Sequence, residues 1–371
     1  MSMRARWRKS WYGWRSRSLN YKKGWRSKQP ILVIESDDWG AEHVPGADAL
    51  EEMKKGTSAF ESCYLNYDGL ERPEDIERLC EVLRTYRDAN GRPAVMTMNF
   101  VMANPDFKAV EQSGYSVFRA KTIDEGFNHE PEGDRLRKSY RRGIEGGMLV
   151  PQLHGQLHFC PDDWLERLRQ GEAGTLKAFK LRMVGENSNA NGIGIQSMAP
   201  IYHTSKESIR HLVEEGVRTF RQVFNMSSLT TIAPCYAWRT PETEQALLSN
   251  GVLAMQGREY QCLPNGSVKP HYSGELGPGG ILYMIRTCRL EPISARTSVD
   301  ECFAQIRDAF ARRVPAVLSS HRVNYTSRVD RSIRDKGLAT LNGVLKRVTQ
   351  AYPDVEFLSS DKLALRILQT N

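Results

Sequence analysis

Five carboxylate and imidazole side chains in this chain follow apolar runs, and together they could cleave a bond with the help of a metal ion. They are Asp37 and Asp38 in ILVIESDDWG, His154 and His158 in PQLHGQLHF, and His321 in AVLSSHRVNY. One carboxylate and two imidazoles bind a borderline divalent ion such as Zn²⁺, and three protein ligands leave a coordination position open for water or substrate. The set therefore predicts a catalytic metal site, with a second carboxylate as base and a third histidine as acid.

The spacing of His154 and His158 indicates the local structure they need. On a helical turn, residues four apart lie on one face and can point at the same ion. On a strand they would also share a face, but about 13 Å apart at ~3.3 Å per residue, which is too far to share one ion. We therefore expect both histidines in a loop or first helical turn after a strand at 148–153.

The adjacent carboxylates Asp37 and Asp38 predict a division of labour. Successive side chains at a strand end diverge, so both do not easily bind the same ion. One is expected to bind the metal and the other to remain free as a base. Taken alone, an Asp-Asp pair usually caps a helix or turn, and two histidines four apart are usually surface or core residues. The placement of both motifs after apolar runs favours the metal site.

The order of these motifs resembles the polysaccharide deacetylases of carbohydrate esterase family four, the nodulation-type deacetylase homology domain, with this chain as a divergent member. In that family, paired aspartates and a glycine end the first strand, and a histidine pair four residues apart follows. The resemblance implies that Asp37 is the general base. The implied metal ligands are Asp38, His154 and His158, with Zn²⁺ as the expected ion. His321, in the position of the fifth motif, is the implied general acid.

The third motif of that family holds a proline and an aromatic residue in a groove wall, just after an arginine that pairs with the base. The nearest match here is Ala233-Pro234-Cys235-Tyr236, in which Ala233 replaces the arginine. Arg239, in the same loop, is the candidate substitute. The resemblance implies that Pro234 and Tyr236 line the substrate groove, and that Tyr236 offers its main-chain amide to the oxyanion.

Two tryptophans flank the proposed site in the chain. Trp39 and Trp238 could stack on a sugar ring, although core packing is the more frequent use of tryptophan. In the fifth motif, Leu318 stands three residues before His321, where the family has two. The remaining histidines have no ligand-like spacing and are expected on the surface or on helices: His43, His129, His203, His211 and His271.

Strand-like and helix-like segments alternate along the chain. The strand candidates are 31–35, 94–100, 148–153, 229–233, 252–255, 281–286, 316–319 and 355–358. The helix candidates are 73–90, 133–144, 161–170, 206–225, 241–250, 299–312, 335–352 and 360–368. Such alternation predicts an α/β protein with a mostly parallel sheet. The resemblance implies a distorted (β/α)7-8 barrel of the polysaccharide deacetylase type, with the catalytic residues at its C-terminal face.

The length of 371 residues is compatible with one large barrel domain, expected at 29–371. Residues 187–197, NSNANGIGIQS, form a polar and glycine-rich stretch that is expected to be a flexible insertion, either a surface loop or a lid over the sugar. The GxG within it lacks the strand-to-helix setting of a dinucleotide site.

Cysteine usage and hydropathy predict a cytoplasmic protein. The seven cysteines are odd in number and have no CxxC spacing, which indicates reduced thiols. No apolar stretch approaches the ~18 residues of a membrane span, and the N-terminus lacks the apolar region of a signal peptide. A cytoplasmic deacetylase of this kind would act on an intracellular precursor.

Residues 1–28 are expected to form a separate basic arm rich in tryptophan. Residues 1–30 hold ten Lys and Arg, no Asp or Glu, and four of the seven tryptophans. Trp7, Trp11 and Trp14 have helical spacing, so one face would carry indoles beside basic side chains. Such a helix suits an anionic membrane surface, which would make the enzyme peripheral on the inner face of the membrane. An arm packed on the barrel is equally compatible with the pattern, and no specific nucleic acid is expected.

Together these features predict a metal-dependent hydrolase that acts on a C–N bond other than a peptide bond. The expected substrate is an N-acetylated sugar of a polysaccharide, lipopolysaccharide or capsule precursor, in cell envelope biosynthesis. Two alternatives stay open at this point. One is a different amidohydrolase on the same scaffold, such as one that opens cyclic amides or removes formyl groups. The other is a lapsed enzyme that binds glycans or serves as a scaffold at the membrane.

Overall fold

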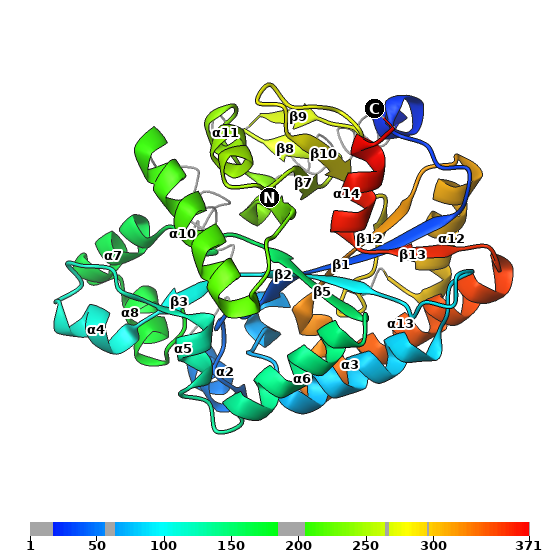
Figure 1. Ribbon diagram of the computed structural model, residues 1–371. Coiled ribbons are helices and arrows are strands. Elements are labelled where there is room, and N and C mark those ends of the chain that lie inside the picture. The colour runs from blue at the N-terminus through cyan, green and yellow to red at the C-terminus, as the bar shows by residue number, and fades with distance from the viewer. Residues whose placement is uncertain (1–17, 56–63, 185–204, 264–266, 295–296, 371) are drawn as a thin grey trace, which may run out of the picture.

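The computed structural model describes residues 18–55, 64–184, 205–263, 267–294 and 297–370, and in this part of the chain nine strands form one central sheet (Figure 1). Their order is β10-β7-β6-β5-β2-β1-β12-β11, and β13 pairs with β1. The strands are β1 (Ile31–Trp39), β2 (Met96–Phe100), β5 (Leu149–Leu153), β6 (Thr230–Ile232), β7 (Ala254–Gly257), β10 (Leu282–Ile285), β11 (Cys288–Arg289), β12 (Ala316–His321) and β13 (Glu356–Leu358). All of these pairings are parallel, which the alternation of elements predicts.

One continuous segment closes this sheet into a barrel. The strands at the two ends of the order, β10 and β11, are separated in the chain only by Arg286 and Thr287. The main-chain N–H of Arg286 donates to the carbonyl of Gly257 in β7 at 2.8 Å, and that of Thr287 donates to Val317 in β12 at 3.0 Å. The same segment thus pairs with both ends of the sheet. The prediction of a (β/α) barrel is confirmed.

The barrel is distorted beside β1. This strand pairs with β12 over most of its length, and on its other side it pairs first with β13 and then with β2. The positions 31–33 of β1 face β13, whereas Ile34 to Trp39 face β2. β13 pairs with only the first three residues of β1. If β10 and β11 are counted as one continuous segment, the barrel has eight strands with β13 and seven without it.

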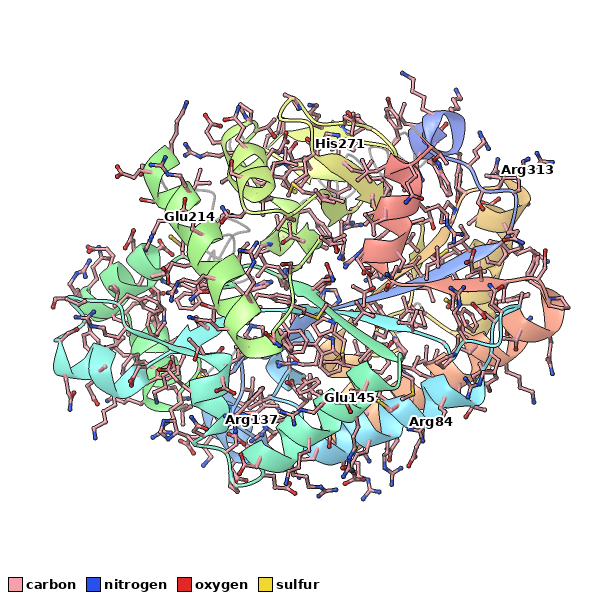
Figure 2. All side chains as sticks on the ribbon, in the orientation of Figure 1. Arg84, Arg137, Glu145, Glu214, His271 and Arg313 are labelled. Atoms are coloured by element: carbon pink, nitrogen blue, oxygen red, sulfur yellow. The ribbon has the colours of Figure 1, made fainter. Side chains whose placement is uncertain are left out.

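Amphipathic helices pack around the sheet and against one another (Figure 1). The longer ones are α2 (Ala47–Lys54), α3 (Pro73–Thr85), α6 (Gly133–Glu145), α7 (Pro161–Arg169), α8 (Ala173–Lys180), α10 (Lys206–Phe224), α11 (Glu242–Ser249), α12 (Val299–Ala311), α13 (Arg331–Ala351) and α14 (Ser360–Leu368). In α13, for example, Leu338, Leu341, Leu345 and Val348 are buried at helical spacing. Charged side chains such as Arg84, Glu145 and Glu214 point outward from these helices (Figure 2).

Short elements that the sequence did not predict decorate the C-terminal face. Two antiparallel pairs join β3 (Ala103–Pro105) to β4 (Ala120–Thr122) and β8 (Tyr260–Cys262) to β9 (Val268–Pro270). Small helices add α4 (Phe107–Gln112), α5 (Ile123–Phe127), η1 (Tyr64–Tyr67), η3 (Pro234–Tyr236) and η4 (Arg322–Tyr325). Strands of three residues carry too little periodicity to be recognised in a sequence.

The described part of the N-terminal arm, residues 18–28, packs on the barrel. Trp25 donates its indole N–H to Thr370 Oγ1 at 2.8 Å and its main-chain N–H to Ser273 at 2.7 Å. Trp7, Trp11 and Trp14 lie outside the described residues, as does the expected insertion at 187–197. Among the described helices, none combines the length and apolar character needed to cross a membrane.

Gly337 of α13 lies so close to η4 that a Cβ atom at this position would overlap the carbonyl oxygen of Asn324. Alanine favours helices over glycine by about 1 kcal/mol, but overpacking typically costs ~1–3 kcal/mol. We therefore expect Gly337→Ala to lower the free energy of unfolding, measured by urea denaturation, although propensity alone predicts a gain. Ala339→Gly, at an exposed position of the same helix, is the control and should cost about 1 kcal/mol. A stabilised Gly337→Ala variant would contradict this close packing.

Candidate metal centre

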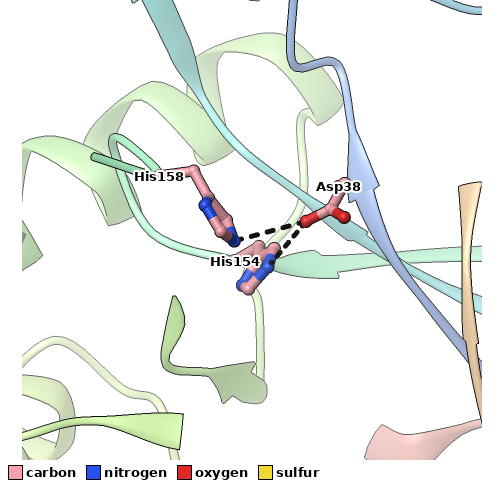
Figure 3. Close-up of side chains that lie close together, drawn as sticks. All are labelled: Asp38, His154 and His158. Carbon is pink, nitrogen blue, oxygen red and sulfur yellow. Dashed lines mark ion pairs between the residues drawn. The ribbon is translucent and has the colours of Figure 1, made fainter. Parts of the chain in front are cut away.

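Asp38, His154 and His158 come together at the C-terminal face of the barrel (Figure 3). Asp38 lies near the end of β1, and both histidines lie in the loop directly after β5. Asp38 Oδ1 is 3.2 Å from His154 Nε2 and 3.4 Å from His158 Nε2. The three potential ligand atoms lie within 4.8 Å of one another. The structure thus places the histidine pair in a loop, as the spacing requires, and close enough to share one ion.

An irregularity at the end of β1 separates the roles of the two aspartates. Asp37 remains in register with His321 of β12, whereas the pairing with β2 shifts between Ser36 and Trp39. Asp38 has a φ of 72°, which is uncommon for a residue with a side chain. This local turn directs the carboxylate of Asp38 toward the histidines, while that of Asp37 faces other partners.

The three side chains fit a divalent cation. Neither oxygen of the buried Asp38 carboxylate receives a hydrogen bond from the described residues. A buried carboxylate without donors is costly unless a cation compensates it. His154 Nδ1 donates to the carbonyl of Ile232 at 2.9 Å, so Nε2 is the ring nitrogen left to face Asp38 and to bind an ion. This is the orientation of a metal-bound imidazole with an outer-shell partner.

The protonation states indicate how a cation would compete with protons. Burial raises the pKa of Asp38, but His154 and His158 outweigh it and hold this pKa well below its usual range. Burial lowers the pKa of His158 to about 4. Burial also lowers the pKa of His154, yet the nearby carboxylates of Asp38 and Asp37 outweigh burial and raise that pKa. A bound ion would displace the proton of His154, so metal affinity should increase with pH.

Arg286 holds the carboxylate of Asp37. Its Nη1 and Nη2 donate to Oδ2 and Oδ1 of Asp37 at 2.6 and 2.7 Å, and Asn99 donates to Oδ1 at 2.8 Å. Burial alone would raise the pKa of Asp37, but Arg286 outweighs burial and lowers it to about 2. The expectation that Arg239 replaces the missing arginine is wrong, because Arg286, in the segment that closes the barrel, takes this place.

The same guanidinium also reaches Glu35. Arg286 Nε donates to Glu35 Oε2 at 2.6 Å, and the Ser360 hydroxyl donates to Oε1 at 2.7 Å. Burial raises the pKa of Glu35 and Arg286 does not fully offset it. One guanidinium therefore lowers the pKa of Asp37, whereas burial leaves the pKa of Glu35 raised. Glu35 was not predicted as a site residue, although a carboxylate within an apolar strand is a signal in the sequence.

His321 lies across from Asp37, with its Nε2 4.0 Å from Asp37 Oδ2. Its Nδ1 bonds to Glu291 Oε1, and Asn324 donates to Glu291 Oε2 at 2.8 Å. Burial lowers the pKa of His321, but Glu291 outweighs burial and raises it well above the usual value. The bond to Glu291 thus favours the protonated form of His321, which is the form that the predicted acid role requires. Glu291 was not predicted, because only the fold brings it to His321.

The two tryptophans expected to stack on a sugar are core residues instead. Trp39 is fully buried, and its indole N–H donates to Ser36 Oγ at 3.0 Å. Trp238 is buried as well, with its ring stacked on His271 and its N–H bonded to Glu244 at 3.2 Å. The prediction of a stacking role is wrong for both, since neither ring face is open to a ligand.

The turn at η3 presents the side chain of Tyr236 rather than its amide. The main-chain N–H of Tyr236 donates to the carbonyl of Ala233 at 2.9 Å, so the predicted oxyanion role of this amide is not supported. Cys235 and Tyr236 both have positive φ values, 55° and 57°, and the Tyr236 hydroxyl lies 3.4 Å from Arg286 Nη1. Pro234 is buried and lines an apolar cavity behind the histidine loop, not a substrate groove.

His43 is a further residue of this site that its sequence spacing did not indicate. Its ring lies edge-on to that of His158, with centroids 5.9 Å apart. Its Nδ1 lies 2.8 Å from Asp68 Oδ2, and Asp68 Oδ1 accepts from Arg322 Nε at 3.0 Å. A histidine fixed by a buried carboxylate thus supports the outer side of a predicted metal ligand.

Comparisons with known proteins give structural similarity alone. No family model matches the sequence, and no curated protein matches it. Among solved structures, a protein from Mycobacterium smegmatis named as a polysaccharide deacetylase is 13% identical, with 93% of each chain covered and a TM-score of 0.48. One so named from Pseudomonas aeruginosa PAO1 is 12% identical over 92% of this chain and 91% of that chain, with a TM-score of 0.44. Puue allantoinase is 12% identical over 94% and 93%, with a TM-score of 0.46. At these values the assignment of the site depends on the geometry above.

If the three residues share one ion, alanine at Asp38, His154 or His158 should each lower metal affinity. The loss should exceed the ~10–100-fold that removal of an outer-shell partner costs. Metal content after dialysis and competition with a chelator give the measurement. His271→Ala is the control, because His271 is also buried but bonds to Glu275 and Gln261. Full metal occupancy in all three variants would remove the site assignment.

Proposed function

We propose that this protein is a metal-dependent hydrolase that removes the acetyl group from an N-acetylated sugar. One observation carries the proposal. The carboxylate of Asp38, which accepts no hydrogen bond from a described residue, faces two histidines, and Asp37 lies 4.0 Å from His321 beside them. Hydrolysis of an amide needs a site for a metal ion that polarises the carbonyl, a base for the water and an acid. The acid is needed because an amine does not leave as an anion.

A divalent ion such as Zn²⁺, held by Asp38, His154 and His158, would polarise the amide carbonyl and lower the pKa of the attacking water toward ~7. Asp37 accepts the proton of this water. With a pKa of about 2, Asp37 is always ionised at neutral pH, but it is a weak base. Asp37 therefore accepts the proton only when the pKa of the water is already lowered, and Arg286 contributes mainly by fixing the orientation of Asp37.

His321 supplies the proton that the leaving amine requires. Its Nδ1 is bonded to Glu291, so its Nε2 is directed to the same space that Asp37 faces. Glu291 keeps the imidazole protonated above the pH at which a free histidine would lose its proton. Base and acid thus approach the scissile C–N bond from adjacent strands, β1 and β12.

Acetate release from a set of N-acetylated sugars, on nucleotide and lipid carriers and as free sugars, tests the proposal. The protein should release acetate with added Zn²⁺ and lose this activity with a chelator. A parallel set of formylated amines and cyclic amides separates deacetylation from other amidohydrolase reactions. A protein that binds metal but cleaves none of these amides would be a binding protein, and the proposal would be wrong.

Asp37→Asn separates the base from the metal ligands. Asp37 makes its contacts with Arg286 and Asn99, so the variant should retain its metal. Loss of a general base typically costs ~100-fold or more in rate. We expect normal metal content with kcat lowered by that factor. Normal turnover in this variant would assign Asp37 a structural role.

Glu291→Gln tests the acid through the pH dependence of kcat/KM. Glu291 raises the pKa of His321, so its removal should shift the alkaline limb of the profile to lower pH. The rate at neutral pH should fall by roughly 10-fold or more, because general acids contribute ~100-fold or more when protonated. Glu275→Gln is a matched control, since Glu275 bonds to His271 in the same manner.

A less stable protein with an unchanged profile would instead make the Glu291–His321 pair structural. The raised pKa of His321 also makes the stability of the fold depend on pH. The pair stabilises the fold at a pH below the usual pKa of histidine, and this contribution is lost as the pH increases through the raised pKa.

A further inference from the structure

Arg258 lies at the rim of the site. It directly follows Gly257, the last residue of β7, so it is at the C-terminal face where the metal centre lies. The carbonyl of Gly257 accepts the main-chain N–H of Arg286, the residue that holds Asp37. Gly257 therefore connects Arg258 to the segment of Arg286, which orients Asp37.

Two aromatic rings hold the guanidinium of Arg258. Its Cζ lies 5.5 Å from the ring centroid of Tyr236 and 5.1 Å from that of Tyr260. Such cation–π contacts restrict a long side chain without neutralising its charge. The hydroxyl of Tyr236 points to Arg286 Nη1 at 3.4 Å, so the Tyr236 ring lies between Arg258 and the catalytic cluster.

Arg258 forms no ion pair within the described part of the chain, although the charge of its neighbour Glu259 attracts it. The side chain is exposed, and no hydrogen bond or ion pair joins it to any described residue. The buried arginines of the barrel behave differently. Arg286, Arg322 and Arg334 each pair with carboxylates at 3.1 Å or less. Arg258 is thus a restrained cation that is open toward solvent beside the site.

Outside residues 1–30 the chain carries no excess of basic residues. The whole chain has a net charge of +8, and residues 1–30 contribute +10, so the remainder is −2 by subtraction. The site itself is rich in carboxylates, with Glu35, Asp37, Asp38 and Glu291. An anionic ligand that approaches them needs a compensating cation near the entrance, and Arg258 has that position.

We propose that Arg258 binds an anionic group, a phosphate or a carboxylate, on the sugar whose acetyl group is removed. This inference rests on the proposed function and narrows its substrate class to acidic or phosphorylated N-acetyl sugars. The planar fork of a guanidinium pairs with both kinds of anion through two parallel hydrogen bonds. The Tyr236 and Tyr260 rings set its orientation in advance, which lowers the entropic cost of binding.

The test compares N-acetylglucosamine, N-acetylglucosamine 1-phosphate and N-acetylmuramic acid, which carry no anion, a phosphate and a carboxylate. Acetate release by the Zn²⁺-loaded full chain should give a kcat/KM at least ~10-fold higher for one anionic sugar than for the neutral sugar, the equivalent of about one charge-assisted contact. Whichever anion is preferred identifies the group.

Arg258→Ala should remove this preference mainly through KM, and Arg258→Lys should retain part of it because the charge remains without the fork. Arg141→Ala, at an exposed position of α6, is the matched control and should behave like the wild type. Equal losses on all three sugars, with a lower melting temperature, would mean that Arg258 only supports Tyr236. No anion preference in the wild type would also overturn the inference.

Binding separates this inference from the proposed function. If no sugar releases acetate, calorimetry with the same three sugars still measures the ratio of their dissociation constants. An anion preference that Arg258→Ala abolishes would support the subsite while deacetylation is refuted. Turnover without any such preference would keep the proposed function and exclude the subsite.

Discussion

The site depends on one buried guanidinium. β1 is buried along its whole length, yet its second half contains Glu35, Ser36, Asp37 and Asp38. Each buried ion costs several kcal/mol unless it is paired. Arg286 compensates this burden with three hydrogen bonds, two to Asp37 and one to Glu35. Because Arg286 lies in the segment that joins both ends of the sheet, the pairing that closes the barrel also places its guanidinium beside Asp37.

A layer of amide side chains inside the barrel extends this cluster. Asn99, which bonds to Asp37, also donates to Gln256 Oε1 at 2.7 Å, and Gln256 donates to Thr230 Oγ1 at 2.8 Å. Thr230 continues the chain to Gln152 at 2.9 Å. Such a layer stabilises a structure only when its members are satisfied. These residues come from four neighbouring strands, so they fix the orientation of Asp37 relative to the whole barrel.

Two histidine–carboxylate pairs flank the metal ligands, and they differ in the surroundings of the carboxylate. Glu291 is bonded to His321 and to the neutral amide of Asn324. Asp68 is bonded to His43 and to the guanidinium of Arg322. His321 and Arg322 are adjacent in the chain, so the start of η4 serves both pairs. Glu291 has no arginine partner among the described residues and stabilises a proton on His321. The charge of Asp68 is instead compensated by Arg322.

The sequence by itself determined the parts that depend on local pattern. Apolar runs located every strand of the central sheet except β11, and parallel strands bring residues at their C-terminal ends together, which is why Asp37, Asp38, His154, His158 and His321 meet as predicted. The assignment of Arg239, Trp39 and Trp238 failed because each was placed by nearness in the chain, and that of the Tyr236 amide failed because it was carried over from the family's motif. Only the tertiary structure decided that Arg286 pairs with a base 249 residues away and that Glu291 and His43 support the histidines. Periodicity shows which side of a strand is buried, but the partner of a buried charge depends on which strands adjoin, and that is fixed only when the barrel closes.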